Sequence, residues 1–258
     1  PMSTTTLLLL LALVGGLTYL YRYAMIGLFA SRSLPAWLHA LCRHIAPASF
    51  AALTASALFV AGDEVVFAFD TPRPWAALVA VLRDITIQAP FRHMVTPGGF
   101  RMSVAMNNCG RYGWVSDESG YRYGALDPAS GKPWPAMPDQ FLKVAQAAAT
   151  DAGFVDFEPD ACLINRYGPG ARLSLHQDKN ERDFSAPIVS VSLGLPAVFL
   201  FGGLRRNDTP ARVLLAHGDV VVWGGPARLR YHGVLPLKAG YHPLTGGHRI
   251  NLTFRKAA

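Results

Sequence analysis

The sequence has 258 residues, of which 51% are apolar and 16% charged, a composition that excludes an intrinsically disordered chain. The formal net charge of +7 is compatible with a polyanionic partner such as nucleic acid, but does not establish one. The three cysteines, Cys42, Cys109 and Cys162, form no CxxC pair. Their spacing argues against a disulfide scaffold or a zinc site and favours a reducing compartment, so we expect a cytoplasmic protein.

The N-terminal segment differs from the rest, because no acidic residue precedes Asp63. It contains an uncharged apolar run, LLLLLALVGGLTYLY at residues 7–21, which is shorter than the roughly 20 residues of a membrane span. Three alternatives remain: a membrane-associated helix that contacts the bilayer through residues 7–30, a signal peptide, or a translation start assigned too far upstream. We therefore expect an apolar extension over residues 1–55 and a folded domain over residues 56–258.

Two segments show the apolar spacing of amphipathic helices, residues 73–85 and residues 137–154. The second has Pro138 near its start and Gly153 near its end, which are the usual positions of these residues in helices. Between the two helices, a Pro-Gly-Gly turn at residues 97–99 precedes an alternating stretch that predicts a strand.

After Cys162 the sequence consists of short β-rich runs separated by Gly, Pro, Asn and Asp. Short strands at close spacing favour a sandwich or jelly roll over a parallel sheet. The two helices would then pack on one outer face. The runs are IVSVSLGL, AVFLFGG, ARVLLAHGDVVVWGG, LRYHGVLPL and RINLTFR.

Two potential metal ligands lie two residues apart in SLHQDKNE, residues 174–181. Positions i and i+2 share one face of a strand, so His176 and Asp178 would point the same way. One imidazole and one carboxylate are two of the three ligands in the facial triad of non-haem Fe(II) enzymes. By itself the pair is a weak signal, and a hydrogen-bonded surface pair is the alternative. The spacing leaves the third ligand open, although His232 lies in a strand-like run. The other candidates are His39, His44, His93, His217, His242 and His248.

The last run, RINLTFR, separates polar from apolar residues by strict alternation. The polar face has two interpretations: the exposed side of an edge strand, or a polar interior that binds a dianion. The second is favoured by the bidentate match between arginine and carboxylate. The polar face consists of Arg249, Asn251, Thr253 and Arg255.

The sequence also contains PFRHMVTPGGFRMSVAMNNCGRYGW, KPWPAMP, DACLINRYGPGARLSLHQDKNE, APIVSVSLGLPAVFLFGGLRRND and HGDVVVWGG. With SLHQDKNE and RINLTFR, these segments resemble the AlkB family of Fe(II)- and 2-oxoglutarate-dependent nucleic-acid dealkylases. The resemblance runs from about residue 61 to residue 254. It implies a mostly β fold with flanking helices, a double-stranded β-helix (jelly-roll) core, and the use of Fe(II), 2-oxoglutarate and dioxygen.

The resemblance also implies roles for individual residues. It selects His232 as the third ligand, so that His176, Asp178 and His232 would hold Fe(II). It assigns 2-oxoglutarate binding to Asn165, Tyr167, Arg249, Asn251 and Arg255. It implies a nucleotide-recognition lid at about residues 91–125, in which Trp114 stacks on the base. Other positions near the base or its phosphates are Thr96, Met106, Tyr121, Asn180 and Arg206. Asn180 replaces the aspartate that is usual in the family, which leaves the preference between adenine and cytosine lesions open.

The function expected from the resemblance is oxidative dealkylation of N-alkylated bases, of the 1-methyladenine and 3-methylcytosine type, with release of formaldehyde. The substrate would be single- or double-stranded DNA, with RNA as a second candidate, and we expect a monomer. The alternatives are a hydroxylase that uses the same chemistry on another substrate, and a tethered nucleic-acid binder without metal. We also expect a cationic track that contacts the phosphate backbone of the nucleic acid. It consists of Arg92, Arg101, Arg111, Arg122, Lys179, Arg205 and Arg206.

Overall fold

The computed structural model describes the backbone of residues 65–68 and 75–258, and the side chains from residue 75 onward. The predictions made for residues 1–55, including the apolar segment and the boundary after residue 55, lie outside the described residues. Within the described part, no helix combines the length and the apolar character needed to cross a membrane.

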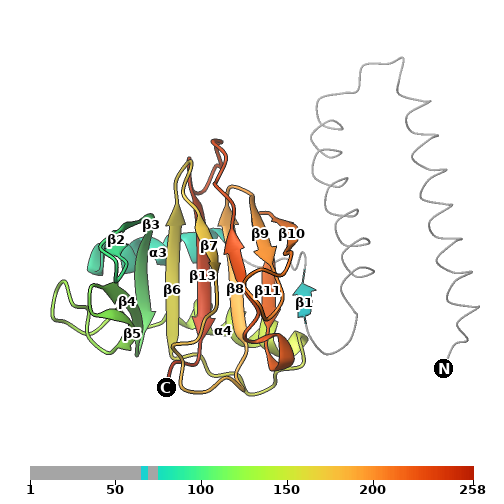
Figure 1. Cartoon of the computed structure of the whole chain (residues 1–258). Helices are drawn as coiled ribbons and strands as arrows, with labels where there is room; N and C mark the ends of the chain where they lie inside the picture. The colour runs from blue at the N-terminus through green and yellow to red at the C-terminus, as the bar shows by residue number, and fades with distance from the viewer. Residues whose placement is uncertain (1–64, 69–74) are drawn as a thin grey trace, which may run out of the picture. The chain divides into compact units, whose positions relative to one another are not determined.

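Two antiparallel sheets form the body of the domain (Figure 1). The larger has the strand order β1-β11-β8-β13-β6-β3-β2 and the smaller β10-β9-β12-β7. The strands of the larger sheet are β1 (Val65–Ala68), β2 (Arg92–Val95), β3 (Arg101–Gly110), β6 (Ala161–Tyr167), β8 (Ile188–Gly194), β11 (Val220–Trp223) and β13 (Arg249–Arg255). Those of the smaller sheet are β7 (Leu173–His176), β9 (Ala197–Phe201), β10 (Ala211–Leu215) and β12 (His232–Val234). This arrangement confirms the predicted mostly β, jelly-roll fold.

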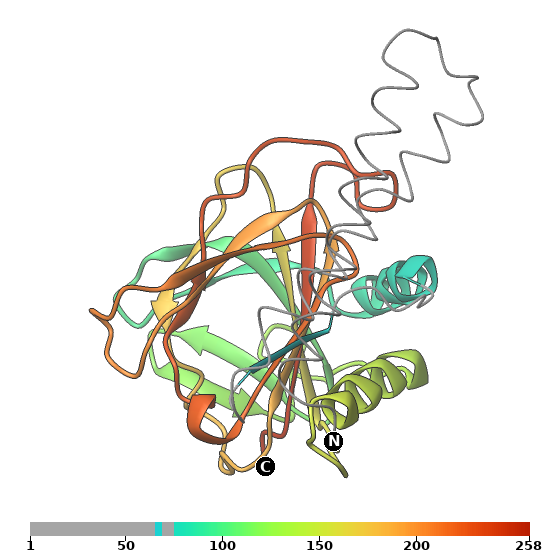
Figure 2. The same cartoon turned by 90° about the vertical axis from the view of Figure 1, so that its right-hand side faces the viewer.

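Two helices, α3 (Trp75–Gln88) and α4 (Asp139–Asp151), lie on the same outer side of the larger sheet, as predicted (Figure 2). Helix α4 buries Phe141, Ala145 and Ala148, whose spacing of three and four residues places them on one face. It ends before Gly153, whose positive φ of 86° favours glycine. Helix α3 extends three residues beyond the predicted end, to Gln88, whose Nε2 donates to the carbonyl of Asp84 at 3.3 Å.

The alternation of β13 gives the larger sheet two different faces. Ile250, Leu252 and Phe254 pack into an apolar cluster with the two helices. The polar residues of the same strand point to the other side, between the two sheets. Because β13 is a central strand paired with β6 and β8, the edge-strand alternative is wrong.

The single run predicted at ARVLLAHGDVVVWGG is two strands in different sheets. Strand β10 pairs with β9 in the smaller sheet, whereas β11 pairs with β8 in the larger one. Between them the chain turns at Gly218, whose φ of 94° is in the left-handed region, and Asp219 accepts a hydrogen bond from the amide of Ala216. This turn joins the two sheets at one end of the domain. A short 3-10 helix, η1 (Gly225–Ala227), follows β11.

A third, two-stranded sheet is the hairpin of β4 (Gly113–Asp117) and β5 (Gly120–Gly124). It falls within the predicted lid at residues 91–125. The same stretch includes β2 and β3, which are strands of the larger sheet. The extent of a lid therefore stays a prediction, and the hairpin is the part of this stretch that pairs only with itself.

Candidate metal centre and substrate pocket

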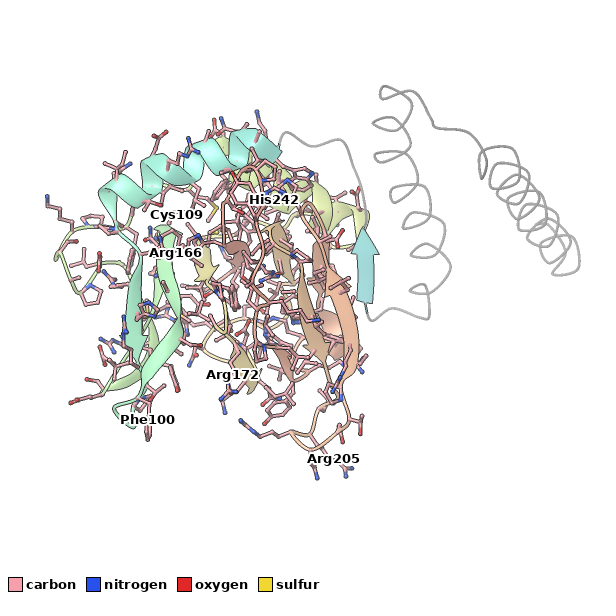
Figure 3. The ribbon with its side chains drawn as sticks, turned by 90° about the horizontal axis from the view of Figure 1, so that it is seen from above. Phe100, Cys109, Arg166, Arg172, Arg205 and His242 are labelled. Atoms are coloured by element: carbon pink, nitrogen blue, oxygen red, sulfur yellow. The ribbon has the colours of Figure 1, made fainter. Side chains whose placement is uncertain are left out.

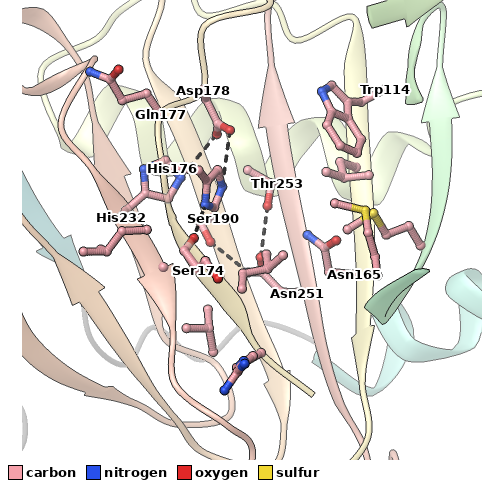
Figure 4. A pocket seen from close by; sticks show the side chains of 18 of the residues that line it. Trp114, Asn165, Ser174, His176, Gln177, Asp178, Ser190, His232, Asn251 and Thr253 are labelled. Carbon is pink, nitrogen blue, oxygen red and sulfur yellow. Dashed lines mark hydrogen bonds and ion pairs between the residues drawn. The ribbon is translucent and has the colours of Figure 1, made fainter. Parts of the chain in front are cut away.

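Two histidines meet where β7 ends and β12 begins. His176 and His232 are directly paired across these antiparallel strands, and their ring centroids are 4.4 Å apart. Asp178 follows just beyond the end of β7, with Oδ1 3.7 Å from His176 Nε2 and Oδ2 3.5 Å from His232 Nε2. One donor atom from each residue lies within 4.8 Å of the others, as drawn in Figure 4. The structure therefore brings the three predicted ligands together.

The backbone fixes the tautomer of both imidazoles. His176 Nδ1 lies 2.8 Å from the carbonyl of Ser174, and His232 Nδ1 lies 3.1 Å from the carbonyl of Arg230. A carbonyl oxygen can only accept, so each Nδ1 carries the proton and each Nε2 has a free lone pair. In both rings that Nε2 faces Asp178. This is the arrangement in which neutral histidine binds a metal.

Protonation also suits metal binding. Partial burial in the pocket, with a smaller contribution from His232, lowers the pKa of His176 to about 4. Burial acts to raise the pKa of Asp178, but Arg255 and the two imidazoles hold it well below the usual value. At neutral pH His176 is therefore neutral and Asp178 ionised, as ligation requires. Two imidazoles and one carboxylate, set beside an open pocket, fit a ferrous ion that keeps positions free for other ligands.

The three residues lie in a pocket of about 800 Å³ between the sheets and the hairpin. Every site residue predicted from the sequence lines this pocket, although the predicted positions span residues 96 to 255. No other group of three or more His, Cys, Asp or Glu side chains within metal-binding reach occurs among the described residues.

The inner end of the pocket holds a buried arginine with unused hydrogen-bond donors. Arg249 is 1% exposed, and its Nη2 donates to Ser192 Oγ at 3.0 Å. Among the described residues, no hydrogen-bond acceptor meets its buried Nε and Nη1, and the guanidinium lies 5.2 Å from the ring centroid of Tyr167. Burial lowers the pKa of Arg249 and raises that of Tyr167 to about 12. A buried cation with free donors marks a place for an anion, since an unpaired charge is otherwise costly.

The amides beside this arginine differ in their availability. Asn165 Oδ1 is buried without a donor. The side chain of Asn251 is already bonded within the protein: its Nδ2 donates to Ser190 Oγ and to the carbonyl of Val191, and its Oδ1 accepts from Thr253 Oγ1. Asn165 thus has a free amide oxygen and Asn251 already has three protein partners, and the 2-oxoglutarate role expected for Asn251 stays a prediction.

The second predicted arginine has protein partners. Arg255 donates to Asp178 Oδ2 from Nη2 at 2.5 Å and from Nε at 3.1 Å. Its Nε also lies 3.3 Å from Glu181 Oε1. Of the two arginines on β13, Arg249 therefore has free donors and Arg255 holds the carboxylate of the metal centre.

The hairpin contributes an aromatic pair. Trp114 on β4 and Tyr121 on β5 stack with centroids 5.5 Å apart and ring planes 14° apart. Asn108 fixes the backbone of Trp114 by donating to its carbonyl and accepting from its amide. Asn180 reaches the hairpin from the other side: its Oδ1 accepts from Trp114 Nε1 at 3.3 Å and its Nδ2 lies 3.5 Å from the carbonyl of Tyr121. These contacts place the aromatic pair beside the pocket.

The residues of the predicted cationic track lie in different surroundings. Arg92 pairs with Asp127 and Arg122 pairs with Asp117, so both carry neutralised charge. In contrast, Arg101, Lys179 and Arg206 line the pocket, together with Arg172, which the sequence interpretation did not single out. The other two predicted residues do not line the pocket: Arg111 lies over the ring of Tyr112, and Arg205 lies on the side away from helix α3, as do Phe100 and Arg172 (Figure 3). Three of the seven predicted cations are therefore at the pocket.

The other histidine candidates in the described part contact groups outside the candidate metal centre, and the backbone carbonyl of His248 accepts from Thr245 Oγ1. His93 Nδ1 contacts the carbonyl of Met102, and His217 Nδ1 accepts the amide of Gly194. His242 Nδ1 accepts the amide of Leu244. His39 and His44 lie outside the described residues, as does Cys42. Among the described residues, Cys109 and Cys162 are buried free thiols.

Sequence reasoning assigned no role to three polar residues near the centre: Tyr123, Glu181 and Arg228. Glu181 is 6% exposed and lies three residues after Asp178, inside the quoted motif. The sequence therefore contained a signal for Glu181, because an acidic residue three positions after a predicted metal ligand can contact the same neighbours as that ligand. The run HQDKNE is so polar, however, that it also fits exposed surface.

Comparison with known proteins gives two family matches. The model of the 2OG-Fe(II) oxygenase superfamily matches residues 70–255. A second model, of the branched-chain amino acid transport protein AzlD, matches residues 7–89, most of which lie outside the described part.

Individual relatives agree with the first match. The Escherichia coli protein named "Alpha-ketoglutarate-dependent dioxygenase AlkB" is 65% identical over 180 residues, which cover 70% of this chain and 83% of the relative. An Arabidopsis thaliana protein named "DNA N(6)-methyladenine demethylase ALKBH1C" is 33% identical over 162 residues, 52% of this chain and 35% of the relative. The solved structure described as "The structure of OsALKBH1" aligns with a TM-score of 0.64 and 29% identity, over 74% of this chain and 96% of that one.

Proposed function

The chain belongs to the 2OG-Fe(II) oxygenase superfamily, and from this premise we propose that it removes alkyl groups oxidatively from bases in DNA. It is an Fe(II)- and 2-oxoglutarate-dependent dioxygenase similar to AlkB. The substrates are N-alkylated bases of the 1-methyladenine and 3-methylcytosine type, and the products are the restored base and formaldehyde. The observation that carries the proposal is one pocket that joins His176, Asp178 and His232 to Arg249 at one end and to the aromatic hairpin at the other.

The metal centre would be held by Nε2 of the two histidines and by the carboxylate of Asp178. When bound, Fe(II) with 2-oxoglutarate and dioxygen supplies the oxidant that hydroxylates the alkyl carbon, after which formaldehyde leaves the base nitrogen. The chain contributes orientation. The carbonyls of Ser174 and Arg230 keep both rings in the ligating tautomer, and Arg255 keeps the carboxylate ionised and directed at the centre.

The cosubstrate would be anchored by Arg249. Its two unused donors match a carboxylate group, and burial strengthens that interaction. Tyr167 lies beneath the guanidinium, and Asn165 lines the same pocket with a free amide oxygen. Because Arg249 and the metal centre are separate features of one pocket, a keto diacid can reach both, one carboxylate at each end.

The base would enter from the hairpin side. A base inside a duplex cannot reach a buried centre, so it must be extruded, and alkylation of its pairing edge lowers the cost of extrusion. Trp114 and Tyr121 offer a stacking surface, and Thr96, Met106 and Asn180 line the same part of the pocket. Lys179 and Arg206 provide positive charge for the flanking phosphates.

Several finer properties stay predictions of the sequence. They are the monomeric state, the choice between single- and double-stranded DNA, activity on RNA, the cytoplasmic location and a membrane contact through residues 7–30. The lid boundaries at about residues 91–125 belong with them.

The test is formaldehyde release from methylated oligonucleotides, with 1-methyladenine and 3-methylcytosine presented in DNA and in RNA. We expect release that requires both Fe(II) and 2-oxoglutarate, with succinate formed in equal amount. An unmethylated oligonucleotide of the same sequence serves as the control. Turnover of 2-oxoglutarate that no member of the panel stimulates would contradict the proposed substrate while leaving the enzyme class intact.

A further inference from the structure

Asp178 belongs to a buried network of two acids and two arginines. The other members are Glu181, Arg228 and Arg255. Arg255 contacts both Asp178 and Glu181. Arg228 donates from Nη1 to the backbone carbonyl of Asp178 at 2.8 Å, and its Nη2 lies 3.2 Å from Glu181 Oε2. Arg228, Arg255 and Glu181 are each no more than 6% exposed. Arg255 therefore contacts both carboxylates, whereas Arg228 contacts the carboxylate of Glu181 and the backbone of Asp178.

The network holds two guanidinium groups and two carboxylates, and one of those carboxylates must also serve the metal. Glu181 contacts both guanidinium groups, whereas the carboxylate of Asp178 contacts Arg255. Without Glu181, the full charge of Arg255 would act on Asp178. A carboxylate neutralised in this way by a buried arginine is a poorer metal ligand, because less of its negative charge remains for the metal.

The network continues to the hairpin. The Tyr123 hydroxyl donates to Glu181 Oε1 at 2.7 Å. Tyr123 is on β5, two residues after Tyr121, so both tyrosines belong to the same face of the strand that carries the stacking pair. A two-stranded hairpin is marginal alone and depends on such contacts for its position. Tyr123 thus joins the element that stacks on the base to the acid that balances the metal ligand.

We propose that Glu181 and Tyr123 are positioning residues: Glu181 shares Arg255 with Asp178 so that the carboxylate of Asp178 stays available to the metal, and Tyr123 couples that balance to the position of the base-stacking hairpin. The inference rests on the proposed function, because it takes Asp178 as a metal ligand and the hairpin as the base-binding element. Binding of metal and binding of alkylated nucleic acid then favour each other.

The first arm of the experiment measures Co(II) affinity of the full chain by the visible absorption of the bound ion, without substrate. Glu181→Gln is expected to bind Co(II) about 10-fold to 100-fold more weakly, the usual consequence of removing a charged partner of a metal ligand. Exposed Glu158→Gln is the matched control, with unchanged affinity expected. Wild-type affinity in folded Glu181→Gln would overturn the charge-sharing role.

The second arm tests the hairpin link. Adding a 1-methyladenine oligonucleotide is expected to tighten Co(II) binding to the wild type several-fold. Tyr123→Phe, which removes only the hydroxyl, should lose most of that tightening. Exposed Tyr241→Phe, which removes a hydroxyl away from the hairpin, is its control and should keep the tightening. Equal tightening in wild type and Tyr123→Phe would overturn the link.

These outcomes separate the inference from the proposed function. A wild type that binds Co(II) but not the oligonucleotide contradicts the dealkylase function, and the first arm still decides the role of Glu181. Both key substitutions nearly preserve side-chain shape, and thermal unfolding followed by circular dichroism confirms that each variant is folded. If Glu181→Gln does not fold, the substrate-free Co(II) affinity of Tyr123→Phe decides, with a several-fold loss expected and no loss contradicting the network.

Discussion

The two faces of the larger sheet come from the same strands and have opposite chemistry. On the outer face, Ile250, Leu252 and Phe254 pack with helices α3 and α4 in an apolar cluster. On the inner face, Arg249 and Arg255 are equally buried, but they lie among hydroxyls, amides and carboxylates. The extent of burial alone therefore does not distinguish the two faces of the sheet.

The difference shows how one strand can serve stability and chemistry together. The outer face stabilises the fold by removing apolar surface from water. The inner face is costly, because charged groups were desolvated and not all found partners. The comparison predicts that inner substitutions change function and outer substitutions change stability.

The largest effect is expected at the metal centre. His176→Ala removes one of three ligands, so formaldehyde release should fall to the level seen without enzyme. The side chain is 38% exposed, so the melting temperature of the metal-free protein should change little. Calorimetry and the formaldehyde assay measure the two properties. Appreciable iron-dependent activity in this variant would contradict the assignment of His176 as a metal ligand.

A smaller effect is expected for Arg249→Gln at the inner end of the pocket. Loss of charged hydrogen bonds costs about 1.5–3 kcal/mol, so KM for 2-oxoglutarate should rise by roughly 10-fold to 100-fold. Stability without cosubstrate should stay equal or increase, because an incompletely paired buried charge is removed. Steady-state kinetics and urea unfolding measure this pair of results. A large loss of stability would mean that Arg249 is mainly structural.

A more selective effect is expected for Trp114→Ala. Stacking of a base on an aromatic ring is worth about 1–3 kcal/mol, so KM for the methylated oligonucleotide should rise about 10-fold. KM for 2-oxoglutarate should stay the same, because Trp114 is on the hairpin and Arg249 is on β13. Parallel titrations of the two substrates check the split. A matching rise for both would show that the hairpin shapes the whole pocket.

The smallest effect on turnover is expected on the outer face. Leu252→Ala empties space in the fully buried cluster and should destabilise the domain by about 2–5 kcal/mol. The turnover of the folded fraction should stay within about 2-fold of the wild-type value, since the side chain points away from the pocket. Urea unfolding and assays at low temperature measure both. A strong loss of turnover in folded Leu252→Ala would contradict the claim that the outer face serves stability and the inner face serves catalysis.

The fold was largely predictable because its signals are local. Alternation in RINLTFR identified both faces of β13, and apolar spacing identified α4. The run ARVLLAHGDVVVWGG was not resolved into β10 and β11, because its apolar pattern continues on both sides of a turn that changes sheets. The predictions for residues 1–55 concern a part of the chain that the structure does not describe.

The site was predictable only in part, because its geometry is set by pairing between distant strands. His176 and Asp178 are close in sequence, but nothing local places His232 opposite His176; the register of β7 and β12 does that. Only the family resemblance identified it. The roles of Glu181, Arg228 and Tyr123 depend on three separate segments that meet around Asp178, and no spacing rule indicates such a meeting.

The unused donors of Arg249 have a consequence for how long the protein lasts in a cell. An anion that binds the folded state alone raises its stability in proportion to the logarithm of its concentration. The lifetime of the chain against proteolysis should therefore increase with the concentration of the keto diacid. When that concentration falls, both the amount of folded enzyme and the turnover of each enzyme molecule should decrease.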